Sequence, residues 1–232
     1  MIAVFLLLFV TGCRSLQPWR DEPGATEVNL SVVFEKNLLY LSSITLNNQK
    51  GRFLFGTSHV RSVLDPDFRT TLGGPRLYAV QLSEKESIRI SPVLLDLGEV
   101  GDGIIGADVF GKSAVSVDYK SGLVTYQKEG IHPEGMVLFQ YGAEPAIELN
   151  VDGRIVRAIV DTASPDTLVL PGNEGRGMAR VAVAGTDFGS IDVKHAPVAE
   201  ARVGNRILSR FLLSIDYRKR IVGLWRDPRI PL

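Results

Sequence analysis

An internal repeat constrains the fold of this chain more than any other feature of its sequence. When Asp161 is placed over Gly56, an offset of 105 residues, apolar segments and turn residues coincide along both halves. The segments that coincide at this offset are 46–48 with 151–153, 53–55 with 158–160, and 62–64 with 167–169. Further along, the offset falls to 98, and residues 106, 117–119 and 123–124 coincide with residues 204, 215–217 and 221–222. A single gap of seven residues reconciles the two offsets, so the chain contains two copies of one unit.

The composition of the two copies favours β-structure. Short runs of Val, Ile and Leu are separated by turn residues, among them Asn47-Asn48 and Asp152-Gly153, and the chain holds 23 glycines. One turn of helix is predicted in each copy, at residues 107–112 and 205–210. We therefore predict an all-β fold of two tandem lobes with at most short helical turns. The predicted boundaries are residues 28–128 for the first lobe, 129–137 for the linker and 138–228 for the second lobe.

One loop of the second copy carries an acid between two apolar strands. Residues 158–160 are apolar, Asp161 follows them directly, and the chain becomes apolar again at residues 167–170. Aspartate is a poor strand former, so this position needs an explanation. A plain turn is one explanation, because the residues after Asp161 favour turns. The other is an active-site loop, in which the carboxylate is held at a strand end, the next hydroxyl locks the loop and small residues let backbone amides approach the acid. The loop residues after the acid are Thr162, Ala163 and Ser164.

This loop resembles the Asp-Thr-Gly-Ser or Asp-Thr-Gly-Ala signature of the retropepsin and pepsin families of aspartic peptidases, with Ala163 where glycine is usual. Residues 102–110 resemble the apolar-apolar-glycine segment that follows the flap in retropepsin-like proteins, and residues 203–205 are its weaker counterpart. Residues 117–119 and 215–217 resemble the next strand of bacterial members. The resemblance covers nearly everything after residue 28. It implies two small β lobes paired about a twofold axis, each contributing one acid loop, so that a chain with both lobes is its own pseudo-dimer.

The chemistry of that family requires a second acid, which this chain lacks. Two carboxylates share one proton, because like charges so close together cannot both be ionised. One then activates a water, and its neutral partner polarises the scissile carbonyl. The first copy has Gly56 at the position of Asp161, followed by Thr57 and Ser58, and glycine supplies no acid. Asp65 falls over Leu170 in the repeat, so it is a poor substitute.

Three interpretations of the missing acid remain open. In the first, the two lobes pair within one chain, and the protein is a degenerate peptidase that binds peptides or has a structural role. In the second, the Asp161 lobes of two chains pair as a homodimer and restore the dyad. In the third, Asp161 supports slow hydrolysis with some other group. By resemblance, the nominal activity is hydrolysis of a peptide or protein substrate through Asp161.

Other function classes find little support in the sequence. The 26 basic and 26 acidic residues balance, which leaves no electrostatic footprint for nucleic acid. No cofactor or metal site is predicted, because the three histidines are scattered and suggest no zinc spacing. Ser58 and Ser164 lie near no obvious histidine base. Residues 171–177 are rich in glycine but lack the ending of a phosphate-binding loop, so we expect a plain connection there. The histidines are His59, His132 and His195.

The N-terminus resembles that of a bacterial lipoprotein. Residues 2–10 form an apolar run too short to span a bilayer as a helix, and it ends in Val-Thr-Gly-Cys at Cys13, the single cysteine of the chain. This resembles a lipobox, which implies a signal peptide at residues 1–12, a lipidated Cys13 and a tether at residues 13–27. The expected location is the bacterial cell envelope, anchored to a membrane and facing the periplasm or the exterior. No Lys or Arg precedes the run, although secretory signals usually have one, so a buried first strand with a chance cysteine is the alternative.

We expect the Cys13→Ser variant to be released from membranes, because the lipid is attached through the cysteine thiol. Membrane fractionation of wild type and variant checks this. A variant that fractionates with the membranes as wild type does would contradict the lipoprotein interpretation.

Overall fold

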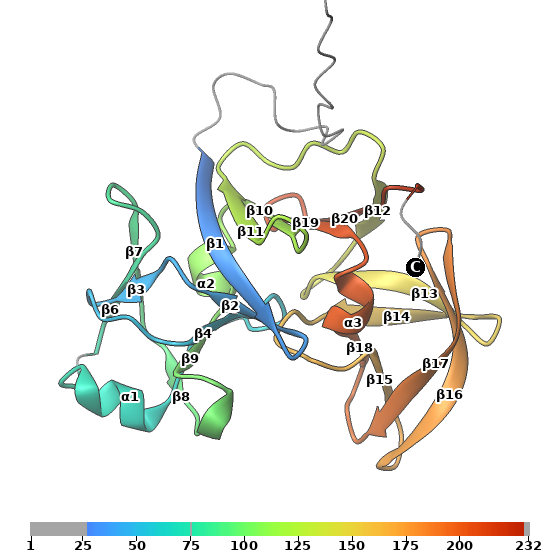
Figure 1. Ribbon diagram of the computed structural model, residues 1–232, viewed down its shortest axis with the longest axis horizontal. Coiled ribbons are helices and arrows are strands. Elements are labelled where there is room, and N and C mark those ends of the chain that lie inside the picture. The colour runs from blue at the N-terminus through green and yellow to red at the C-terminus, as the bar shows by residue number, and fades with distance from the viewer. Residues whose placement is uncertain (1–26, 75, 230–232) are drawn as a thin grey trace, which may run out of the picture.

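The computed structural model describes residues 27–74 and 76–229 (Figure 1). The predicted signal peptide, Cys13 and all of the predicted tether except Glu27 lie outside the described residues. The predicted all-β class is confirmed, since the described residues form twenty strands, three short α-helices and one 3₁₀ turn. Within this part of the chain, no helix combines the length and the apolar character needed to cross a membrane.

The first half of the chain contains eleven strands and most of the helical turns. Its strands are β1 (Glu27–Glu35), β2 (Leu38–Leu41), β3 (Thr45–Leu46), β4 (Phe53–Phe55), β5 (Val63–Leu64), β6 (Tyr78–Gln81), β7 (Ser87–Ile90), β8 (Val93–Leu94), β9 (Gly103–Ile105), β10 (Ala114–Asp118) and β11 (Leu123–Gln127). Its helices are α1 (Pro66–Thr71), the 3₁₀ turn (Gly98–Val100) and α2 (Ala107–Phe110).

The second half contains nine strands and one short helix. Its strands are β12 (Val137–Gln140), β13 (Ala146–Val151), β14 (Arg154–Val160), β15 (Leu168–Pro171), β16 (Gly175–Val183), β17 (Thr186–Ala196), β18 (Ala201–Val203), β19 (Leu212–Asp216) and β20 (Ile221–Trp225), and its helix is α3 (Asn205–Leu208). The helices α2 and α3 occupy the two places where a helical turn was predicted.

A sheet that runs through both halves joins them (Figure 1). From one edge of the sheet the strand order is β12-β20-β19-β10-β11-β1, and the halves meet where β10 pairs antiparallel with β19. Ser116 pairs with Ser214 in the middle of this contact, and their hydroxyl oxygens are 2.7 Å apart. These serines are 98 residues apart, which is the offset of the repeat, so equivalent residues face each other. The buried apolar side chains also form one large core cluster that draws on both halves.

Strand pairing around the two predicted loops follows one pattern. In the first half, β4 pairs parallel with β9, β9 antiparallel with β5, and β5 parallel with β8. In the second half, β14, β18, β15 and β17 repeat this order with the same directions. The amide of Gly56 donates to the carbonyl of Ile105, and the amide of Asp161 donates to that of Val203, both at 3.0 Å. Gly56 and Asp161 therefore leave their strands through equivalent backbone connections.

The two halves differ in how their remaining strands are arranged. In the second half, six strands close a barrel in the order β13-β14-β18-β15-β17-β16. In the first half, β3, β6 and β7 form a separate three-stranded sheet, and β8 is an end strand of the large sheet. Residues 171–177, predicted to be a plain connection, are in fact partly strand, because β15 ends at Pro171 and β16 begins at Gly175. Gly175 pairs with His195 of β17, and this pairing overrides the weak strand preference of glycine.

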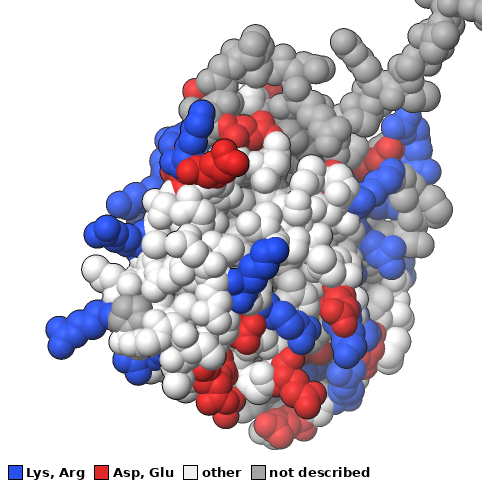
Figure 2. All heavy atoms as spheres, turned by 60° about the vertical axis from the view of Figure 1, so that its left-hand side comes forward, with Lys and Arg blue, Asp and Glu red and all other residues white. Residues whose placement is uncertain are grey.

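The charged surface agrees with the balanced composition. On the face shown in Figure 2, acidic and basic side chains lie next to each other around the lower part, and uncharged residues fill much of the middle. This face therefore carries no broad patch of one sign.

Gly106 and Gly204 occupy equivalent places in the repeat, and each packs closely against a backbone carbonyl. A Cβ atom at Gly106 would lie 2.5 Å from the carbonyl oxygen of His59, and one at Gly204 would overlap the carbonyl oxygen of Asp166. We expect Gly106→Ala and Gly204→Ala each to lower the free energy of unfolding by about 1–3 kcal/mol through overpacking. Gly142→Ala is the matched control, because a Cβ there meets nothing within 4 Å. Urea denaturation measures all three, and an unchanged midpoint for either of the first two variants would contradict this packing.

Candidate functional site

Two threonines lock the predicted loops to each other within one chain. The amide of Thr57 donates to the hydroxyl oxygen of Thr162 at 3.1 Å, and the amide of Thr162 donates to the hydroxyl oxygen of Thr57 at 3.2 Å. Each hydroxyl then donates across the contact, Thr57 to the carbonyl of Val160 at 2.6 Å and Thr162 to that of Phe55 at 2.5 Å. Both threonines are fully buried, and every polar group in the exchange has a partner. The loops that begin at Gly56 and Asp161 therefore face each other.

The buried carboxylate of Asp161 is held by its own loop and by an arginine. Its Oδ1 accepts the amide of Ala163 at 3.1 Å, as expected of a small residue that lets its backbone approach the acid. Ala163 lies outside the positive-φ region, so alanine in place of glycine adds no backbone strain here. Its side chain packs against a small apolar cluster of the first half that includes Leu54 and Ile104.

The second oxygen of Asp161 is paired with Arg202. The guanidinium Nη1 of Arg202 lies 3.1 Å from Oδ2 of Asp161, and the arginine side chain is about one-third exposed. Arg202 belongs to β18, and the repeat places it over Ile104 of β9. A guanidinium stays protonated at any pH that a protein tolerates. The only acid of the two loop positions therefore faces a permanent positive charge.

The space opposite Asp161, where a second acid would project, is already occupied. A Cβ atom built on Gly56 would overlap Cγ2 of Ile104 and lie 2.9 Å from Nδ1 of His59. The amide of His59 donates back to the carbonyl of Gly56, which folds the imidazole over the glycine. The absence of a side chain at Gly56 is thus what admits His59 and Ile104 to this position.

His59 brings a titratable group into the site that the sequence analysis did not anticipate. Burial lowers the pKa of His59 below its usual range, although the Asp161 charge opposes this shift and Arg202 reinforces it. The imidazole is therefore neutral at pH 7. Nδ1 of His59 also lies 3.3 Å from Oγ of Ser58. The expectation that Ser58 has no histidine near it was wrong, because the next residue in the chain, His59, brings its imidazole within reach of the hydroxyl.

The remaining predicted residues have structural roles around the loop. Ser164 donates its amide to the carbonyl of Asp161 at 3.2 Å, and its hydroxyl accepts the amide of Asp166 at 3.3 Å. Asp65 caps α1 and accepts the amides of Asp67 and Leu97, so it is engaged away from the site. Across residues 27–74 and 76–229, no three His, Cys, Asp or Glu side chains are grouped so that they could hold a metal ion.

Sequence reasoning missed Arg202 and His59. The repeat carried a signal for Arg202, because a charged residue falls over Ile104 in a short strand that pairs with the strand entering the acid loop. His59 had a weaker signal, its place three residues after Gly56, where the other copy has Ser164.

Comparison of the chain with protein-family models gave no match, and comparison with curated proteins gave none either.

The reciprocal contact of the two threonines can be tested by a double-mutant cycle. We expect Thr57→Val and Thr162→Val each to lower the free energy of unfolding by about 1–3 kcal/mol, because each leaves buried polar groups unsatisfied. The double variant should lose clearly less than the sum, because each single change already breaks the shared network. Thr45→Val in β3, away from the loops, is the control. Additive losses, measured by denaturant unfolding, would show that the two residues act separately.

Proposed function

We propose that this protein is a retropepsin-like protein that has lost peptidase chemistry and binds extended peptides at the surface beside its two loops. The observation that carries the proposal is that the two acid-loop positions meet within one chain, while only one of them supplies a carboxylate and that carboxylate is paired with Arg202.

Three features support the retropepsin-like arrangement. Ser116 pairs with its repeat counterpart Ser214, as a twofold relation between β10 and β19 requires. The strands around Gly56 and Asp161 pair in the same order and directions. The hydroxyl after each loop position donates to a carbonyl of the opposite half and so fixes the loops.

Peptidase chemistry lacks one of its two groups in this geometry. The partner of Asp161 across the loops is Gly56, and Ile104 and a neutral His59 fill its space. The group that faces the carboxylate of Asp161 is the guanidinium of Arg202, and not a second acid with which it could share a proton. Loss of positioned proton transfer commonly costs 10²–10⁴-fold in rate. Replacing Gly56 by Asp alone would not restore the dyad, because the new side chain would collide with Ile104.

A dyad made from two chains is disfavoured by the same contacts. For the Asp161 loops of two molecules to face each other, Thr162 would have to exchange Thr57 for its own copy, and β19 would have to leave β10. Both contacts are buried and continuous with the core that spans the two halves. The pairing within one chain therefore opposes the homodimer interpretation.

Peptide binding is supported by groups that adjoin the locked loops. Arg202 has five N–H donors and uses one for Asp161, so others are free for a peptide carbonyl or carboxylate. Val60 in the first loop is 66% exposed, and both residues of the nearby strand β8 are exposed as well. Val93 and Leu95 donate their amides towards β5, which directs the amide of Leu94 to the outer edge. An extended peptide can add to such an edge as a further strand.

We expect wild type to cleave no peptide and to bind apolar decapeptides, because the surface beside the loops offers exposed apolar groups and a strand edge but the site lacks the dyad. Cleavage is assayed for wild type and Asp161→Asn at acidic and neutral pH over a range of protein concentrations. Binding is measured by fluorescence anisotropy. Leu94→Pro at the β8 edge should weaken the binding roughly tenfold, because proline removes the amide that would donate to the added peptide strand. Arg89→Gln on β7 is the control.

Cleavage that rises with protein concentration and disappears in Asp161→Asn would overturn the binding proposal in favour of a peptidase assembled from two chains. Cleavage that is independent of concentration and lost in Asp161→Asn would identify Asp161 as active within one chain. Absence of both cleavage and peptide binding would also contradict the proposal.

A further inference from the structure

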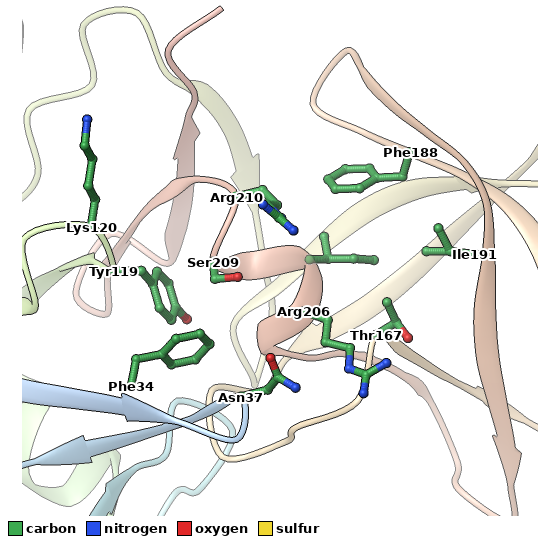
Figure 3. A pocket seen from close by; sticks show the side chains of 11 residues that line it. Phe34, Asn37, Tyr119, Lys120, Thr167, Phe188, Ile191, Arg206, Ser209 and Arg210 are labelled. Carbon is green, nitrogen blue, oxygen red and sulfur yellow. The ribbon is translucent and has the colours of Figure 1, made fainter. Parts of the chain in front are cut away.

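A groove of about 680 Å³ crosses the outward face of α3, separate from the locked loops (Figure 3). Both halves of the chain contribute to it, through the β1–β2 hairpin, the turn after β10, the helix α3 and the strand β17. We call this feature the α3 groove. Its lining residues are Phe34, Asn37, Tyr119, Lys120, Thr167, Phe188, Ile191, Arg206, Ile207, Ser209 and Arg210.

The α3 groove has two apolar walls. Phe34 and Tyr119 form one, with their rings edge to face and their centroids 5.3 Å apart. Phe188 and Ile191 of β17 form the other, on the opposite side of α3 (Figure 3). Phe34 is 39% exposed, a large share for a phenylalanine that contacts another ring. The groove therefore offers flat apolar surface to a ligand from two sides.

Two arginines without acidic partners project between these walls. Arg206 and Arg210 are four residues apart and exposed, and Figure 3 shows both between the Phe34–Tyr119 pair and the Phe188–Ile191 pair. No lining residue is acidic, and no ion pair is formed by either arginine within the described part of the chain. Lys120 points away from the groove in Figure 3, and its charge acts on Asp227. The uncompensated charge of the groove therefore comes from the two arginines.

A buried asparagine holds the groove open. The side-chain amide of Asn205, fully buried at the start of α3, donates to the carbonyl of Asn37 at 2.8 Å and to that of Thr162 at 2.7 Å. Its oxygen accepts the hydroxyl of Tyr119 at 2.7 Å. These bonds tie the hairpin that carries Phe34, and Tyr119 itself, to α3. The first wall is thus fixed in place before any ligand arrives.

We propose that the α3 groove binds a small organic anion, with its carboxylate or phosphate group on Arg206 and Arg210 and its apolar body between the two walls. Guanidinium groups match the paired oxygens of carboxylates and phosphates, and such charge-assisted hydrogen bonds are the strong ones. The volume lies within the usual range for small-molecule sites, and the lining combines apolar side chains with polar and charged groups. This inference does not depend on peptide binding at the loops.

Anilinonaphthalene sulfonate is a suitable probe, because its sulfonate stands in for the carboxylate or phosphate and its fluorescence reports the binding. We expect one site on wild type, and affinity lowered about tenfold by Arg206→Gln and by Arg210→Gln, the loss of one charge-assisted hydrogen bond each. Arg89→Gln, an exposed arginine on β7, should bind as wild type does. The uncharged analogue phenylnaphthylamine should bind all four proteins equally and weakly.

Displacement of the probe distinguishes the two head groups. Octanoate and octyl phosphate should displace it, and the stronger of the two identifies the preferred head group. Octanol and inorganic phosphate should each be at least tenfold weaker, because each lacks one half of the recognised chemistry. Backbone amide shifts at Phe188 and Ile191 should change on titration with the stronger ligand. Equal probe affinity in wild type and both arginine variants, displacement by octanol as strong as by octanoate, or shifts confined to other parts of the chain would overturn the proposal.

Discussion

The exchange of hydrogen bonds between Thr57 and Thr162 is the contact on which the arrangement of the two halves depends. Each threonine satisfies backbone groups of the opposite loop, so neither loop can hold its conformation while the other is absent. Because the hydroxyls are buried, separation of the halves would expose unpaired carbonyls and amides in both. The pairing of β10 with β19 and the shared core then follow from the same approach of the two loops.

The asymmetry of the site arises from three repeat positions around the two loops. Gly56 opposes Asp161, Ile104 opposes Arg202, and His59 opposes Ser164. On the first side the missing side chain is replaced by apolar and neutral groups, and on the second side the acid is neutralised by a cation. The backbone connections around both loops are nevertheless alike. The side chains of the two loops therefore differ, whereas the backbone connections that position them are alike.

The repeat made much of the fold predictable, because equivalent apolar segments must pack in equivalent ways. The turns at Asp152-Gly153 and the helical turns at α2 and α3 followed from local residue preferences. The barrel closure of the second half and the length of β16 and β17 could not be predicted, because they depend on which strand edges meet. The sequence identified Asp161 and Gly56 as site positions but not Arg202. Arg202 lies at the site because β18 pairs parallel with β14, and this pairing also depends on which strand edges meet.

The closed barrel of the second half has a consequence for how the molecule fluctuates. Each strand of this closed ring has a partner on both sides along part of its length, so the amides in those segments exchange with solvent mainly when a strand pair opens. The first half instead ends at β8 and carries a small separate sheet, so its outer strands can detach singly. Hydrogen exchange should thus divide this chain into a slowly opening body around Asp161 and a more labile one around Gly56, although both are built from the same repeated unit.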